Sequence, residues 1–209
     1  CDSTRHGCGT FSDEAKEALE RLDARVGILL EALKARGLDG DTVIAVVSDH
    51  GQADIKGCVT LNAWFQEQGI PARVQSLGLG AYVRIHRGDY QQVLQALSHH
   101  MEELRISRIY TREMLRAMHA PEDVYLAVEP EEGFVIAEDS CEPDHKATHG
   151  FGLRHPGADC LLWLSGPMFP RGARLDSCQL VDIAPTLARA VHLQLPKSQG
   201  RALDELFLQ

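Results

Sequence analysis

Apolar side chains spaced three and four positions apart predict a long amphipathic helix near the start of the chain. Ser12 and the two acidic residues after it are typical of a helix N-terminus, and Gly37 ends the pattern. The apolar positions of this helix are Leu19, Leu22, Val26, Leu29, Leu30 and Leu33. A continuous apolar run follows over residues 42–47. Continuous rather than alternating apolarity is typical of a strand buried on both faces, as in a parallel sheet covered by helices.

Similar patterns near the end of the chain predict a second strand and a second helix. Residues 160–165 form another apolar run, closed by Gly166 and Pro167. Asp182 begins a helix with Pro185 in its first turn, where proline is tolerated. With the first helix and strand, these elements favour the α/β class: a doubly wound, mostly parallel sheet with helices on both faces.

The middle of the chain carries shorter elements in a different order. We expect strands over 81–86 and 106–110, helices over 89–104 and 111–118, and a hairpin formed by 124–128 and 133–137. This mixed series between two α/β blocks suggests a subdomain inserted into the main sheet. The sequence therefore predicts an inserted α+β subdomain over 59–138, with 1–58 and 139–209 forming the main domain.

Composition and net charge limit the kind of protein this is and the kinds of molecule that it binds. The chain has 209 residues, of which 44% are hydrophobic and 24% charged, which is ordinary for a globular protein. No apolar stretch approaches the ~18 residues of a transmembrane helix, so we expect no membrane span. A net charge of −9 without a basic run argues against binding to a nucleic-acid polymer. A chain of this net charge does not attract a small anionic substrate by itself. A bound metal ion would supply the positive charge that holds such a substrate.

The six cysteines are scattered and contain no C-x-x-C pair, which excludes a zinc ribbon and a thioredoxin motif. We expect buried free thiols in a reduced or mildly oxidising compartment, which favours the cytoplasm over the periplasm. The chain opens without Met on a polar stretch over 1–9, which we expect to be a loop. Because domains rarely begin on such a loop, we expect the C-terminal part of a longer protein, with about 150–200 residues upstream.

The tetrapeptide Ser48-Asp49-His50-Gly51 directly follows the first apolar run. In open α/β sheets the carboxyl ends of the strands are where ligands bind. Asp oxygen and His nitrogen are ordinary zinc ligands, and Gly51 allows the chain to turn. The alternative is that Asp49 caps the next helix and His50 lies on the surface.

Two further clusters combine the same residue types. Asp2 and His6 lie four residues apart on the expected opening loop, and His149 is followed by Gly150. His145 is a second candidate, ranked behind His149. Each cluster alone is weak, because loops are rich in Asp and Gly and a lone His is usually structural. Together the three clusters supply nearly enough ligands for two metal sites of three or four ligands each, as in two-metal phosphoryl-transfer enzymes.

The combined motifs resemble a known superfamily. D-x-x-x-H-x-x-G over 2–9, V-V-S-D-H-G over 46–51 and T-H-G over 148–150 resemble the alkaline phosphatase superfamily, in particular its type I phosphodiesterase/nucleotide pyrophosphatase family. Segment 181–187 with Gly200-Arg201-Ala202-Leu203 is similar to the terminal helix that this family shares with the sulfatases. Tyr110-Thr111-Arg112-Glu113 is similar to a stretch of bacterial phosphodiesterases.

The resemblance implies an alkaline-phosphatase-like fold and a site with two zinc ions. Asp2, His6 and His149 would hold one zinc, and Asp49 and His50 would belong to the other. The family's Thr or Ser nucleophile and a further Asp ligand lie upstream of these motifs, so we expect no catalytic nucleophile in this chain. Ser3, Thr4 and Thr10 do not stand in its place.

The implied function is metal-dependent hydrolysis of phosphodiester or pyrophosphate bonds in small phosphodiesters or nucleotides. Arg5 stands where relatives usually carry Gly, and it could contact the substrate. We expect this chain alone to be inactive or weakly active. A phosphonoacetate-type hydrolase, a phosphomonoesterase or a sulfatase of the same superfamily stays open, although the sulfatase motif C/S-x-P-x-R is not found here. A non-catalytic metal-binding module is the alternative of another class.

Overall fold

The chain divides into two compact units, which are described separately. The first consists of Cys1–Glu20 and His50–Asp159, and the second of Arg21–Asp49 and Cys160–Gln209. The predicted inserted subdomain over 59–138 lies within the first unit, and its boundaries stay a prediction. The computed structural model describes residues 1–141, 145–150, 152 and 155–208.

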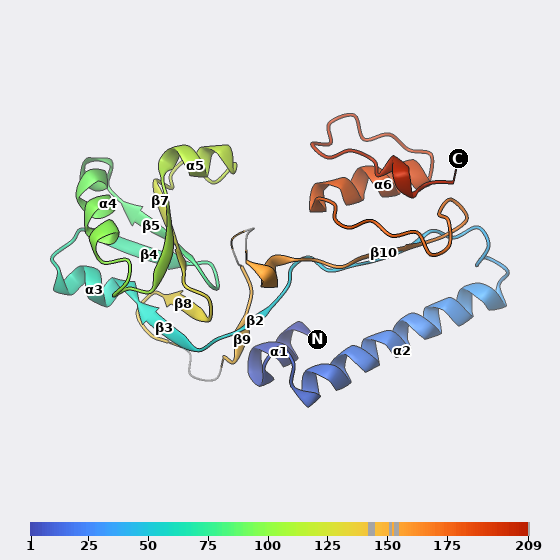
Figure 1. Ribbon diagram of the computed structural model, residues 1–209, viewed down its shortest axis with the longest axis horizontal. Coiled ribbons are helices and arrows are strands. Elements are labelled where there is room, and N and C mark those ends of the chain that lie inside the picture. The colour runs from blue at the N-terminus through green and yellow to red at the C-terminus, as the bar shows by residue number, and fades with distance from the viewer. Residues whose placement is uncertain (142–144, 151, 153–154, 209) are drawn as a thin grey trace. The chain divides into compact units, whose positions relative to one another are not determined.

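A four-stranded antiparallel sheet is the centre of the first unit (Figure 1). Helices α3 (Leu61–Glu67) and α4 (Tyr90–His99) pack on one face, and η1 (Arg87–Asp89) leads into α4. Side chains alternate along a strand, so Val83 belongs to this core while Tyr82 packs on the opposite face with helix α5 (Arg112–Ala117). In spatial order the strands are β4 (Ala72–Ser76), β5 (Ala81–Ile85), β7 (Leu126–Pro130) and β6 (Ile106–Tyr110).

The predicted strands over 81–86 and 106–110 and the short helix after Thr111 are confirmed. The predicted hairpin of 124–128 with 133–137 is wrong. Strand β7 joins the four-stranded sheet, whereas β8 (Phe134–Ala137) pairs in parallel with β3 (Gly57–Thr60). A short apolar strand does not specify its partner, and two strands close in sequence are usually read as a hairpin.

A disulfide joins Cys58 of β3 to Cys141, just after β8. The expectation of buried free thiols is therefore wrong for these two cysteines. It is also wrong for Cys8, Cys160 and Cys178, because all three are exposed. The disulfide links the two ends of the predicted inserted subdomain. Its partners lie 83 positions apart, a separation from which sequence spacing alone gives no pairing.

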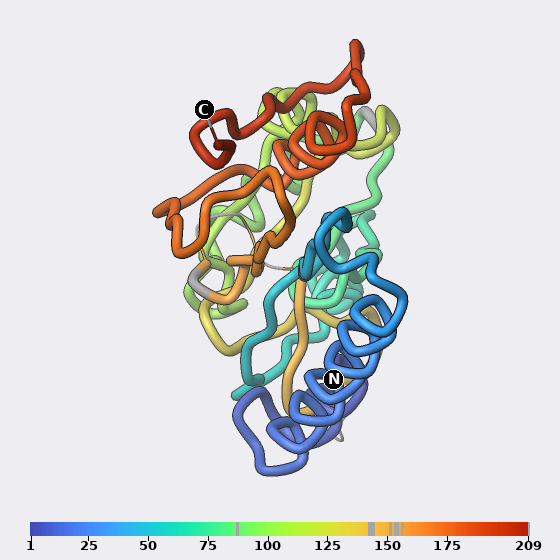
Figure 2. Tube along the Cα trace, turned by 90° about the vertical axis from the view of Figure 1, so that its right-hand side faces the viewer, coloured from blue at the N-terminus to red at the C-terminus, as the bar shows by residue number. Residues whose placement is uncertain are grey.

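The opening stretch forms a helix, α1 (Asp2–Cys8), rather than the expected loop. It packs against a two-stranded antiparallel pair, β2 (Ala53–Asp54) with β9 (Ala147–Thr148). Figure 2 shows the dark blue start of the chain beside the yellow-orange strand β9 from a second direction. The short helix η2 (Pro156–Ala158) completes the first unit.

The long helix predicted from periodicity is α2 (Asp13–Ala35), which begins in the first unit and continues into the second. In the second unit β1 (Ile44–Val47) pairs antiparallel with β10 (Leu162–Ser165), so the two predicted apolar strands are neighbours. Both are more exposed than expected: Val47 is 50% and Trp163 is 48% exposed. Neither strand has a parallel neighbour among the residues that the structure describes.

The end of the chain is fixed around a buried carboxylate. Asp182, at the end of η3 (Leu180–Asp182), accepts hydrogen bonds from the backbone N–H groups of Gln179 and Arg201. Helix α6 (Ile183–Ala190) follows, and the buried Thr186 hydroxyl accepts from the Leu203 N–H before η4 (Asp204–Leu206). Within the described part of the chain, no helix is long and apolar enough to cross a membrane.

The disulfide gives a first prediction. Reduction of the denatured protein should expose two additional thiols, those of Cys58 and Cys141, to a thiol-reactive dye. In the chain-entropy model, a closed loop of 83 residues stabilises the fold by about 4.5 kcal/mol. We therefore expect reduction to lower the free energy of unfolding by roughly 2–5 kcal/mol in denaturant titrations. A Cys178→Ala variant serves as the control and should leave the effect of reduction intact. Equal thiol counts before and after reduction would contradict the assignment.

Candidate metal centre

Helix α1 places Asp2 and His6 on one face, one turn apart. Asp2 lies in the first turn, where the N-terminal end of the helix dipole favours a carboxylate. The helix ends at Gly9, whose N–H donates to the carbonyl of Arg5 and whose φ of +103° suits glycine. The four-residue spacing noted in the sequence is therefore the spacing of a helical turn, not of a loop.

Strand β9 brings the third residue to this helix. The Lys146 N–H donates to the carbonyl of His6 at 2.7 Å, which ties the strand to α1. On its other side, Thr148 pairs with Ala53 of β2. His149 directly follows the strand, so its position is set by these two sets of backbone contacts.

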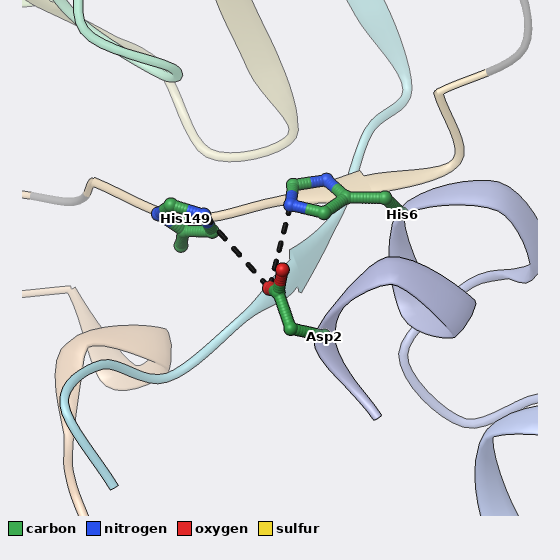
Figure 3. A group of neighbouring side chains, drawn as sticks. All are labelled: Asp2, His6 and His149. Carbon is green, nitrogen blue, oxygen red and sulfur yellow. Dashed lines mark ion pairs between the residues drawn. The ribbon is translucent and has the colours of Figure 1, made fainter. Parts of the chain in front are cut away.

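Asp2, His6 and His149 form a compact group whose ligand atoms all lie within 4.8 Å of one another. Asp2 Oδ1 lies 3.4 Å from His6 Nε2 and 3.9 Å from His149 Nε2, as the dashed lines in Figure 3 show. Two ligand atoms of a tetrahedral zinc ion stand about 3.3 Å apart, since each zinc bond is ~2.0–2.1 Å long. The three side chains therefore nearly have the spacing that a metal ion requires.

Two further contacts orient these side chains. His6 Nδ1 lies 2.7 Å from the carbonyl of Ala147, so the Nδ1–H tautomer donates there and leaves Nε2 able to bind a metal. The Gln52 amide donates to Asp2 Oδ1 at 3.0 Å. Sequence reasoning missed Gln52, although its place directly after Asp49-His50-Gly51 put it next to a candidate site.

Glycines let the backbone near His149 pack closely against the turn between β4 and β5. A Cβ on Gly78 would lie 2.7 Å from the carbonyl oxygen of His149, and one on Gly150 would lie 2.7 Å from that of Leu77. Both glycines also have positive φ values, +100° and +94°. The glycine after His149 is thus explained by backbone packing and conformation.

His50 lies beside the group, and its ring stacks on that of His149 with centroids 3.7 Å apart and planes 19° apart. Gly51 is in close contact with the carbonyl of Gly157, which leaves no room for a side chain. Asp49 belongs to the second unit, so its placement with His50 at a second metal stays a prediction.

Arg5 and His145 also lie near the group. Arg5 is on α1 between Asp2 and His6, and its buried Nε has no hydrogen-bond partner among the described residues. The centroid of the His145 ring is 5.2 Å from that of His6. Contact of Arg5 with a substrate and a ligand role for His145 both stay predictions.

Comparison with known proteins decides the family. The family model for type I phosphodiesterase/nucleotide pyrophosphatase matches residues 1–152, which include all three clusters. The chain therefore belongs to this family. The resemblance read from its motifs is confirmed.

Similar proteins agree with this assignment. Ectonucleotide pyrophosphatase/phosphodiesterase family member 1 of Mus musculus is 40% identical over 65 residues, which are 30% of this chain and 7% of that protein. Bis(5'-adenosyl)-triphosphatase ENPP4 of Pongo abelii is 23% identical over 202 residues, covering 95% of this chain and 44% of that protein. The chain thus spans less than half the length of either relative.

Solved structures confirm the α/β, alkaline-phosphatase-like fold. Human ectonucleotide pyrophosphatase/phosphodiesterase 5 matches with a TM-score of 0.83 at 16% identity, over 99% of this chain and 56% of that one. An inactive variant of the murine protein in complex with AMP matches with the same TM-score at 17% identity, over 99% of this chain and 56% of that one.

The geometry predicts how single substitutions change metal affinity. Removing His149 deletes one of three ligands, so His149→Ala should weaken zinc binding by at least 100-fold in competition with a chromophoric chelator. Gln52→Ala removes only the contact that orients Asp2, and we expect a loss of roughly 10-fold. The exposed His99 is the matched control, and His99→Ala should bind zinc as the unchanged protein does. Equal losses for His149→Ala and His99→Ala would contradict the assignment.

Proposed function

We propose that this protein is a zinc-dependent hydrolase of phosphodiester and pyrophosphate bonds, and that Asp2, His6 and His149 hold one of its zinc ions. The observation that carries the proposal is the convergence of these three side chains in a chain of this family. Two imidazoles and one carboxylate are a donor set typical of catalytic zinc sites, which keep a further position open.

The surroundings of the three ligands suit this role. The Asp2 and His149 side chains are 53% and 34% exposed, so a substrate can reach the site, while His6 is 20% exposed and fixed by Ala147. A bound zinc ion would stabilise negative charge on a phosphoryl or leaving oxygen. It would also give a chain of net charge −9 the local positive charge that an anionic ester needs. Arg5 would add a guanidinium beside the bound anion.

We further propose that Asp49 and His50 belong to a second zinc site, and that the nucleophile and the remaining ligand lie outside these 209 residues. The contact between the His50 and His149 rings supports two neighbouring sites. Two observations support additional covering structure: the chain matches only part of each relative, and the apolar side chains of Val47 in β1 and Trp163 in β10 are exposed.

The substrate that we propose is a nucleotide or another small phosphodiester. The name of the Pongo abelii relative specifies a dinucleoside triphosphate, and the murine structure contains AMP. The acidic net charge supports a small substrate rather than a nucleic-acid polymer. The Cys58–Cys141 disulfide favours an oxidising compartment over the cytoplasm, because disulfides are rare in cytosolic proteins.

The decisive assay is turnover of bis(4-nitrophenyl) phosphate with and without added zinc. For the 209-residue chain we expect little or no turnover, because a missing nucleophile removes most of the rate. A longer form of the protein should turn over the diester, lose activity to a chelator and recover it with zinc. In that form, His149→Ala and Asp49→Asn should each lower kcat/KM by at least 100-fold, whereas His99→Ala should not.

The same assay separates the alternatives. Preference of the longer form for 4-nitrophenyl phosphate or 4-nitrophenyl sulfate over the diester would indicate a phosphomonoesterase or a sulfatase. Zinc binding by the longer form without turnover of any ester would indicate a metal-binding module. Near-normal turnover of the diester by residues 1–209 alone would show that the nucleophile lies within this chain.

A further inference from the structure

A carboxylate on the four-stranded sheet binds the segment that follows His149. Glu129 in β7 accepts the backbone N–H of Gly152 on Oε1 at 2.9 Å. Its other oxygen accepts the hydroxyl of Tyr110, at the end of β6, at 2.5 Å. Gly152 lies three residues after His149, so the two oxygens of one carboxylate connect the sheet to the metal centre.

The surroundings of Tyr110 keep its hydroxyl protonated, so it donates the hydrogen bond to Glu129. Burial, followed by the hydrogen bond to Glu129, raises the pKa of Tyr110 to about 12. The hydroxyl therefore keeps its proton throughout the ordinary pH range. The Arg108 guanidinium lies 4.8 Å from the centroid of the Tyr110 ring, and Arg108 stands opposite Glu129 in the strand register. These contacts hold the donor in place on the sheet.

The contact with Gly152 leaves no room for a side chain. A Cβ on Gly152 would overlap both carboxylate oxygens of Glu129. On the other side of His149, Gly78 of the β4–β5 turn lies against the carbonyl of His149 itself. Three contacts thus fix the backbone near His149. Thr148 pairs with β2, the carbonyl of His149 lies against the β4–β5 turn, and Gly152 donates to Glu129.

We propose that Glu129, held by the Tyr110 hydroxyl, is a positioning residue for His149 in metal binding. This inference rests on the metal-binding role proposed above. Glu129 acts through the backbone N–H of Gly152, three residues after His149. The four-stranded sheet thereby serves the metal centre as a rigid support, although none of the three ligands lies on it.

The experiment measures zinc affinity by chelator competition in the Tyr110→Phe and Glu129→Gln variants. Tyr110→Phe removes the hydroxyl and keeps the ring, and Glu129→Gln removes the negative charge that both donors face. Loss of an outer-sphere contact typically weakens metal binding by 10–100-fold, and we expect about 10-fold for Tyr110→Phe and more for Glu129→Gln. Both variants disrupt the same chain of contacts from Tyr110 through Glu129 to Gly152. The fold-loss of zinc affinity in the double variant should therefore be smaller than the product of the two single fold-losses.

Two matched controls separate positioning from general damage to the sheet. Tyr82 packs in the same side-chain cluster as Tyr110, and Glu131 follows Glu129 by two residues and pairs with Arg105. Tyr82→Phe and Glu131→Gln should retain full zinc affinity. Thermal unfolding of the metal-free proteins checks that each variant is folded at the temperature of the zinc measurement; Tyr110→Phe should lose only the modest stability that one hydrogen bond contributes. Equal zinc affinity in Tyr110→Phe and Tyr82→Phe would overturn the proposal.

A second readout makes the result independent of zinc. Amide hydrogen exchange in the metal-free protein should accelerate at least 10-fold at Gly152 in Tyr110→Phe and Glu129→Gln, but not in the controls. If the unchanged protein binds no zinc, the proposed function fails. If amide exchange at Gly152 is unaltered in Tyr110→Phe and Glu129→Gln, the positioning role of Glu129 fails, whatever the zinc result. Should Glu129→Gln fail to fold, Gly152→Ala tests the same contact from the loop side and should weaken zinc binding without changing either strand.

Discussion

The short strand β9 is the constraint on which the candidate metal centre depends. It contacts two elements that are remote in sequence. On one side the Lys146 N–H, just before β9, donates to the carbonyl of His6 in α1, and on the other side β9 pairs with β2. A two-residue pair is marginal by itself, so its stability must come from what surrounds it. The Thr10 N–H donates to the Asp54 carboxylate at 2.7 Å, which adds a side-chain contact between the end of α1 and β2. Because α1 carries two of the ligands and the residue after β9 carries the third, a shift of β9 would separate the group.

The surrounding sheet explains how so short a strand can be precise. The β4–β5 turn approaches the His149 backbone so closely that glycine is needed at Gly78 and Gly150. Glu129 then accepts the Gly152 N–H from the other end of the same segment. The large apolar core that α3 and α4 form with the sheet makes this support stiff, because close-packed side chains resist small displacements. The candidate centre thus combines one exposed and two partly exposed polar side chains with a backbone that is fixed from several directions.

Much of the site could be predicted from sequence, because ligand chemistry is carried by residue type. The resemblance to the family implies that Asp2, His6 and His149 form one ligand set, and the structure brings these three side chains together. Long periodic elements such as α2 are predicted correctly from the sequence. The helix at Asp2 was missed, since Ser3, Thr4 and Gly7 are typical of loops and the helix is stabilised by its contact with β9. The partner of β8, the Cys58–Cys141 disulfide and the contacts of Gln52 and Glu129 all join residues far apart in the chain. Neither periodicity nor spacing contains that information.

X-ray absorption at the zinc edge of the zinc-loaded protein tests the central claim most directly. The account predicts one tightly bound zinc ion for the three-ligand group, with nitrogen and oxygen neighbours at about 2.0–2.2 Å and the multiple-scattering pattern of two imidazoles. His149→Ala should reduce the imidazole count to one. Cys1 directly precedes the ligand-bearing helix and Cys8 is its last residue, so thiol ligands are the alternative to imidazoles. Sulfur neighbours at about 2.3 Å, or an imidazole count that does not change in His149→Ala, would contradict the account.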